Sequence, residues 1–283
     1  MPLSGPVQVL ESTHGVAVTP SSSIGMNGIP GTGASGSTGC TFCVGLRVQL
    51  HELIERFAAG SVTLIDVGGD VVATGTEPTL SSPLADALAL AAATGLPVRT
   101  DVAVAGPGLD GELAEPNVRA VLATAGSDCH RLSASDAKGF LAALNRHPSE
   151  ATTLLAASAL GISGLAEIRD SAALVPVNEA SADFFVTTGE AALGRNAVAR
   201  RLMGTRSLDE AEAAVHEICG FTELDHERAK AHALAGSPER ETTRAELRAR
   251  LEEYRISARA RGVDLGSFRP SQRCLADVGT IRT

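Results

Sequence analysis

Residues Ser61–Ala93 read SVTLIDVGGDVVATGTEPTLSSPLADALALAAA. The stretch begins with an almost continuous apolar run from Val62 to Val67, rich in β-branched residues, and this run ends at Gly68-Gly69. An apolar run of this length that stops at glycines is typical of a strand covered on both faces. A long acidic loop follows, and then a segment rich in alanine and leucine. The stretch therefore predicts a strand, a loop and a helix.

Residues with known positional preferences mark the ends of the predicted helix. Ser82 can cap it, and Pro83 suits its first position because the missing N–H has no helical partner there. Asp86 falls in the first turn, where its charge favours the helix dipole. Gly95 ends the helix, and a second apolar run, Val98–Ala105, follows at once. The whole predicts a βαβ unit with parallel strands.

The remaining segments extend this unit into a larger α/β domain. The spacing of apolar residues and caps predicts further helices over 44–57, 113–125, 135–144, 149–160 and 207–218, and short strands over 172–177 and 183–187. We expect three layers, with a mostly parallel, Rossmann-like sheet and helices on both faces. The predicted divisions are an irregular glycine- and serine-rich segment over 1–39 with one short strand near 7–10, an α/β domain over 40–235, and a C-terminal extension over 236–283 with a long helix at about 237–261.

Composition argues against several classes of partner. The 283-residue chain carries a net charge of −9 and 3% aromatic residues, which is unfavourable for phosphate backbones and for base stacking. No apolar run reaches the roughly 20 residues that span a bilayer. The N-terminus lacks the basic and apolar regions of a signal peptide. Five cysteines without framework spacing fit a reducing cytosol, so we expect a cytoplasmic protein with no nucleic-acid or membrane partner.

Two acidic glycine loops follow the two predicted strands of the βαβ unit. The carboxyl ends of neighbouring parallel strands meet at one sheet edge, where such folds bind ligands. Carboxylates gathered there can hold a hard cation such as Mg²⁺ or serve as acid and base. Asp66 and Asp70 are therefore predicted catalytic residues or Mg²⁺ ligands, because an aspartate that ends a buried strand is costly without a role. The predicted substrate-binding residues are Gly68, Gly69, Ser82, Gly106, Asp110, Gly111 and Glu112.

The alternative for these loops is structural. Their acids can be solvated and their glycines can simply satisfy turns. We favour this interpretation for Glu77 and for Asp86. The basic cluster formed by Arg195, Arg200 and Arg206 can meet an acidic substrate, but a solvated surface explains most of it.

Two further motifs carry weak signals. GTGASG at 31–36 matches a dinucleotide-binding pattern, but no strand precedes it and no helix follows it directly. Cys40 and Cys43 form a C-x-x-C, for which a redox pair at a helix start and a zinc site are both open. No second ligand pair completes a zinc site, so two unrelated buried cysteines are the favoured interpretation.

Five stretches of the chain resemble a known family. They are IDVGGDVVATGTEPTLSSPLADALALAAA from Ile65, GPGLDGEL from Gly106, HPSEAT from His147, GTRSLDEAE from Gly204 and TELDHERAKA from Thr222. Over roughly 61–234 the chain resembles the uncharacterised family called "domain of unknown function 1152". The resemblance implies a cytosolic α/β protein and brings no established activity. Family members start with a strand–loop of the type Gly-Gly-Gly-Gly-Asp, which this chain lacks, so we expect a divergent short member, a fragment, or a site completed by a partner chain.

The leading hypothesis is an enzyme that acts on a small polar or anionic metabolite by hydrolysis or group transfer. The alternative is a non-catalytic small-molecule-binding or assembly protein, because no complete catalytic constellation is visible. Self-association or a partner chain is compatible with both. A thiol redox function at Cys40 and Cys43 is a third hypothesis.

Overall fold

The computed structural model describes residues 42–144, 149–168 and 173–234. The helices are α1 (Cys43–Phe57), α2 (Ala85–Ala93), α3 (Glu115–Thr124), α4 (Ala134–Leu144), α5 (Glu150–Ala159), α6 (Gly189–Arg195), α7 (Ala197–Leu202), α8 (Leu208–Cys219) and α9 (Glu223–Leu234). The strands are β1 (Ser61–Val67), β2 (Arg99–Ala105), β3 (Asp128–Arg131), β4 (Gly164–Glu167), β5 (Leu174–Val177) and β6 (Asp183–Thr188). Two 3₁₀ turns, η1 (Asp70–Val72) and η2 (Glu179–Ala182), complete the order.

The main described sheet has the strand order β1-β2-β6-β3. β1 and β2 pair in parallel, with Asp66 opposite Val104, as the βαβ pattern predicts. β6 runs antiparallel to β2 and to β3. Strands β4 and β5 form a separate antiparallel pair. The α/β class is confirmed, but the expected mostly parallel sheet is corrected for the described strands, because β6 returns against its neighbours.

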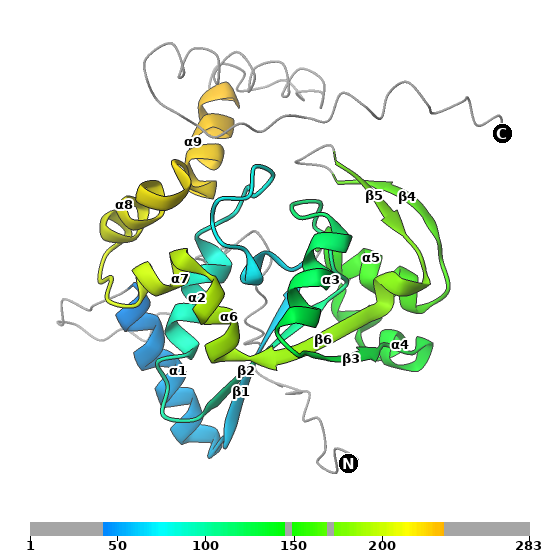
Figure 1. The fold of residues 1–283 in the computed structure, drawn as a ribbon, viewed down its shortest axis with the longest axis horizontal. Coiled ribbons are helices and arrows are strands. Elements are labelled where there is room, and N and C mark those ends of the chain that lie inside the picture. Colours follow the sequence, from blue (N-terminus) through cyan, green and yellow to red (C-terminus); the bar gives the residue numbers. More distant parts are fainter. Residues whose placement is uncertain (1–41, 145–148, 169–172, 235–283) are drawn as a thin grey trace.

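Helices pack on both faces of this sheet (Figure 1). On one face, Val102 and Val104 share a core with residues of α2, α3, α7 and α8, including Leu90 and Leu122. On the other face, Ala105 packs in a cluster with Leu155 of α5 and two valines of β5. This second cover is incomplete at β1, where Ile65 is 55% exposed.

Local sequence signals found most of the described elements. The predicted helices over 44–57, 113–125, 135–144, 149–160 and 207–218 correspond to α1, α3, α4, α5 and α8. Ser149 and Ser207 cap α5 and α8 through their side chains, as expected of serine at a helix start. Sequence patterns did not predict β3 and β4, which have four residues each, or α6, α7 and α9. These elements are short, or in α9 mostly polar, so they lack a clear apolar period.

Some predictions lie outside the described residues. They are the segment 1–39 with its strand near 7–10 and the GTGASG motif, Cys40, and the C-terminal extension from 236. Among the helices that the structure does describe, none combines the length and the apolarity that crossing a bilayer requires.

Candidate functional site

Five carboxylates gather at the carboxyl edge of β1 and β2, and we call Asp66, Asp70, Asp86, Asp110 and Glu112 the carboxylate cluster. Asp66 is the penultimate residue of β1 and Asp70 opens η1. Between them the chain turns through Gly68 and Gly69, whose φ angles of 133° and 113° are accessible to glycine but strained for other residues. Asp86 lies in the first turn of α2, and Asp110 and Glu112 lie in the loop after β2.

Asp66, Asp70 and Asp86 form the tightest part of the cluster. One carboxylate oxygen from each lies within 4.8 Å of the others. The three residues are 3%, 7% and 7% exposed. Oxygens this close repel one another when all three groups are charged, and a proton or a cation between them would relieve the repulsion. Three carboxylates from a strand, a 3₁₀ turn and a helix therefore converge on one buried point.

The two glycine loops lie against each other, as the sequence predicts. The Gly108 N–H donates to the Gly68 carbonyl oxygen at 2.6 Å. Glu112 then links the second loop to the segment before α2: its Oε2 accepts from the backbone N–H groups of Ser81 and Ser82 at 2.8 and 3.1 Å. The Ser82 hydroxyl lies 2.5 Å from Glu112 Oε1 and 3.2 Å from Asp70 Oδ2. Both oxygens of Glu112 are thus engaged within the protein.

Asp110 keeps one carboxylate oxygen that no described residue engages. Its Oδ1 accepts from the Glu112 N–H at 3.1 Å, whereas its buried Oδ2 accepts no hydrogen bond from the described part of the chain. The side chain occupies the space beside Gly68: a Cβ at Gly68 would lie 2.1 Å from Asp110 Oδ2. The glycine therefore lets the second loop bring a carboxylate close to the end of β1.

Burial dominates the electrostatics of the cluster. It raises the pKa of Asp66 well above its ordinary value, and the charges of Asp86 and Asp110 raise it further. The pKa of Asp70 rises for the same reasons, with burial as the largest and Asp86 as the next cause. Burial and the charge of Glu112 raise the pKa of Asp110. Burial also raises the pKa of Asp86, to about 6.

The described part of the chain supplies no compensating base to the cluster. None of its ion pairs involves any of the five carboxylates. The arginine on the loop side, Arg195, instead donates to the Val72 carbonyl at 2.7 Å and lies 4.0 Å from Glu77. Buried carboxylates without a basic partner take up protons or bind metal ions.

The separation of the oxygens suits a hard divalent cation. Ligand oxygens lie at roughly 2.1 Å from Mg²⁺ and roughly 2.5 Å from Ca²⁺, so opposite ligands are about 4.2 to about 5 Å apart. The three aspartate oxygens fall within this span. Carboxylate oxygens are also the ligand type that such cations prefer. Asp66, Asp70 and Asp86 therefore fit a cation site, with Asp110 beside it as a further oxygen donor.

The predicted substrate-binding glycines mostly face the protein's own side chains. A Cβ at Gly69 would meet Val118, and one at Gly106 would meet Leu109. At Gly111 it would meet Ala173. These glycines allow close packing of the two loops, and their role in ligand binding stays a prediction.

The expected cap of α2 is wrong. The Ser82 side chain contacts Asp70 and Glu112 instead of the helix, and α2 has no side-chain cap from its N-cap residue, Leu84. The cap comes from Glu223, whose carboxylate accepts from the N–H groups of Leu84 and Ala85 at 2.9 and 2.6 Å. Glu223 is partly buried, and this burial raises its pKa to about 7.

Glu77 and Cys43 have structural surroundings. Glu77 accepts from the backbone N–H groups of Thr74 and Gly75, and so closes a turn, in line with its predicted structural role. Cys43 is buried at the start of α1, and burial raises the pKa of its thiol. An activated thiol needs the opposite shift, so this environment does not support the redox hypothesis.

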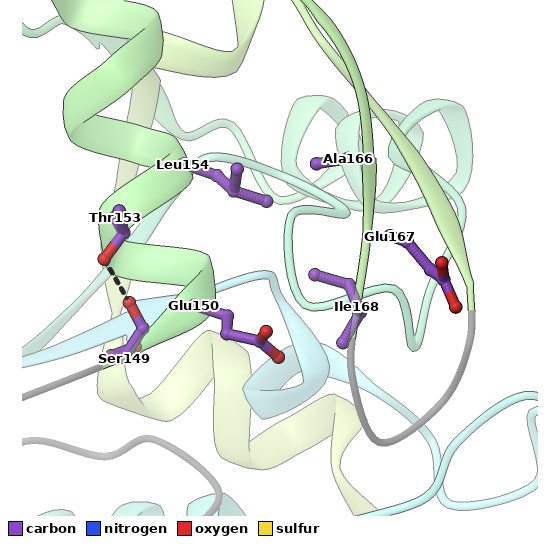
Figure 2. A pocket seen from close by; sticks show the side chains of 7 residues that line it. All are labelled: Ser149, Glu150, Thr153, Leu154, Ala166, Glu167 and Ile168. Carbon is purple, nitrogen blue, oxygen red and sulfur yellow. Dashed lines mark hydrogen bonds between the residues drawn. The ribbon is translucent and has the colours of Figure 1, made fainter. Parts of the chain in front are cut away.

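A separate hollow lies between α5 and the end of β4 (Figure 2). It encloses about 210 Å³, which is below the roughly 300–1,000 Å³ of typical small-molecule sites. Glu150, Leu154 and Ile168 are among its lining residues, and none of the five cluster carboxylates lines it. The hollow is therefore distinct from the carboxylate cluster.

Two residues at the cluster were not predicted as part of the site. Glu223 was not singled out, and the expectation that Asp86 is a solvated acid is wrong, because Asp86 is 7% exposed and lies beside Asp66 and Asp70. The signal for Asp86 was present, because it is the one charged residue in ADALALAAA, and a lone acid in an otherwise apolar helix is buried with its neighbours. Glu223 gave no local signal, because its partners Leu84 and Ala85 lie 139 and 138 positions away.

Comparison with known proteins identifies the family but no activity. No match was found among curated proteins or among solved structures. The sequence profile of the family described as "Protein of unknown function (DUF1152)" matches residues 41–231, which include every carboxylate of the cluster and Glu223. The chain therefore belongs to the DUF1152 family.

Proposed function

We propose that this protein is a cation-dependent enzyme that acts on a small polar or anionic metabolite by hydrolysis or group transfer. The observation that carries the proposal is the convergence of Asp66, Asp70 and Asp86 within 4.8 Å, buried and without a basic partner in the described chain. Buried carboxylates without a basic partner favour the binding of a positively charged ion. The cation would be Mg²⁺ or a similar hard ion, held by these three carboxylates.

The chemistry follows from the carboxylates around such an ion. A divalent cation supplies Lewis acidity, polarising a substrate oxygen or lowering the pKa of a water. Asp110, with one oxygen that no described residue engages, is placed to accept a proton or to orient a substrate hydroxyl. Glu112 and Ser82 hold the two loops together, and so fix where Asp70 and Asp110 lie.

The surroundings of the cluster suit a small ligand. The cluster lies at the carboxyl ends of β1 and β2, the location at which Rossmann-like units bind ligands, and we assign the β1–α2–β2 unit to that type. An acidic chain without a basic stripe favours a metabolite over a nucleic acid and fits a cytoplasmic enzyme.

Cation binding tests the proposal most directly. Calorimetric titration of the metal-free protein with Mg²⁺, Mn²⁺ and Ca²⁺ should show one site, and Asp66→Asn and Asp70→Asn should lose it. A thermal-shift screen of nucleotides, sugar phosphates and amino acids with and without Mg²⁺ then seeks the substrate class, because a ligand of the native state raises the midpoint. If ligand binding and turnover both survive in Asp66→Asn and Asp70→Asn, the enzyme proposal is lost.

A second function is favoured by the low exposure of the cluster. A cation held by almost fully buried aspartates would stabilise the loops of a non-catalytic binding or assembly protein. The two functions differ in whether the bound ion keeps a water ligand. Relaxation of water protons by bound Mn²⁺ reports this: fast exchange of a coordinated water supports the enzyme, and its absence supports the structural site.

A further inference from the structure

The N-terminus of α2 is held by a residue from the far end of the described chain. A helix leaves its first N–H groups without helical partners, and its own N-cap, Leu84, provides no side-chain acceptor. Glu223, the first residue of α9, fills this need with both carboxylate oxygens. The contact joins α9 to the first turn of α2, close to the carboxylate cluster.

This contact fixes the part of α2 that carries a cluster residue. Ala85, which donates to Glu223 at 2.6 Å, directly precedes Asp86 in the chain. Asp66 and Asp70 are placed by β1 and η1. The position of Asp86 relative to them depends on how the start of α2 is held, and Glu223 provides the side-chain hydrogen bonds there.

The choice of a carboxylate is costly for a purely structural cap. Glu223 adds a further, partly buried acid near the cluster, and burial together with the charge of Glu112 raises its pKa to about 7. A neutral serine or asparagine side chain caps a helix without this cost. Glu223 instead accepts from two successive N–H groups at the start of α2, and the two hydrogen bonds together fix both the position and the orientation of the first turn.

We infer that Glu223 is a positioning residue of the cation site, acting through the first turn of α2 to place Asp86 against Asp66 and Asp70. The inference rests on the proposed cation site and adds a component from α9 to it. Partners of this kind, which orient a ligand without touching the ion, typically contribute about tenfold or more to metal affinity.

The test compares two variants on the same pair of helices. Glu223→Gln keeps the size of the side chain but replaces one acceptor oxygen with an amide that cannot accept from an N–H. Glu212→Gln is the matched control, because both carboxylate oxygens of Glu212 accept from Arg228, between α8 and α9. Mn²⁺ affinity is measured by calorimetry, and the thermal midpoint of each metal-free protein is measured alongside.

We expect Glu223→Gln to weaken Mn²⁺ binding about tenfold while Glu212→Gln stays within about twofold, even if both lower the midpoint equally. Should Glu223→Gln not fold, Glu223→Asp, which retracts the charge by one methylene, replaces it with the same expectation. Equal Mn²⁺ affinity in wild type and Glu223 variants, or an equal loss in the control, overturns the inference alone. A wild-type protein that binds no cation overturns the proposed function, and this inference with it.

Discussion

Two buried aspartates at the same edge of the sheet have opposite surroundings. Asp183, 6% exposed, opens β6 beside the loop after β2 and pairs with two arginines, Arg131 at 2.6 Å and Arg119 at 3.0 Å. Asp66, 3% exposed, is the penultimate residue of β1 and has other carboxylates as neighbours. The Gly106 N–H, at the end of β2, donates to the Asp183 carbonyl, which places β6's start at this edge.

The difference separates a structural acid from a candidate functional one. The charge of Asp183 is balanced within the fold, so its burial is stabilised by hydrogen bonds and ion pairs that are already present. The charge of Asp66 is not balanced by the described residues, and burial there favours a proton or a cation. Substitutions at the two sites should therefore have opposite effects on stability and on cation binding.

Removing one aspartate of the cluster should abolish cation binding without destabilising the metal-free fold. Asp66→Asn removes a charge that has no basic partner, so we expect Mg²⁺ affinity to fall about 1,000-fold, equivalent to about 4 kcal/mol. The free energy of unfolding in EDTA should stay the same or rise, because like charges are relieved. Calorimetric titration and urea unfolding measure the two quantities. A metal-free Asp66→Asn protein less stable than wild type would contradict this account.

The pH dependence of stability should reveal the same imbalance. Asp86 has a folded pKa of about 6 against an ordinary value of 3.8, so between these pH values the native state holds a proton that the unfolded chain has released. Stability of the metal-free protein should therefore fall as the pH rises from about 4 to about 6, by about 3 kcal/mol from this residue alone. Asp66 and Asp70 act in the same direction.

Urea unfolding at pH 4.5 and 6.5 in EDTA, and again in saturating Mg²⁺, measures this effect. Bound cation should offset the loss at the higher pH, because it stabilises only the native state. The Asp66→Asn protein serves as the control and should show a smaller loss than wild type. A wild-type stability that rises with pH in EDTA would be the opposite sign and would remove the electrostatic basis of the site.

Local sequence signals explain why four of the five cluster residues could be predicted together. Asp66, Asp70, Asp110 and Glu112 follow strands that a βαβ pattern already pairs in parallel, so their shared edge follows from connection rules. Asp86 and the Glu223 cap depend on how α2 and α9 pack, and the pattern of a single helix does not contain that information.

The antiparallel direction of β6 could not be predicted from the sequence, for a related reason. Its burial alternates along Asp183–Thr188, and this pattern is the same whether the strand runs parallel or antiparallel. Direction is set by the path of the chain through α4, α5 and the β4–β5 pair. The prediction of a mostly parallel sheet is therefore wrong at β6, whereas the predicted parallel pairing of β1 and β2 is confirmed.

Asp183→Asn should have the opposite profile to Asp66→Asn. It removes the shared partner of two arginines, so we expect a loss of about 2 kcal/mol in the free energy of unfolding, below the roughly 3–5 kcal/mol of a fully buried pair because both arginines are partly exposed. Mg²⁺ affinity should be unchanged. Urea unfolding and calorimetry on the same preparation measure both. A loss of cation binding in Asp183→Asn would show that the two sites are coupled.

The smallest effect is expected at Arg131, one of the two arginines that pair with Asp183. The Arg131 side chain is 46% exposed, and Asp183 keeps Arg119 when Arg131 is removed. Arg131→Gln should therefore lower the free energy of unfolding only slightly at low salt and less at high salt, as for other exposed pairs. Urea unfolding at two salt concentrations measures it. A loss of unfolding free energy as large as that of Asp183→Asn would mean that one exposed arginine alone compensates the buried charge of Asp183. A single basic residue near Asp66 could then compensate its charge in the same way.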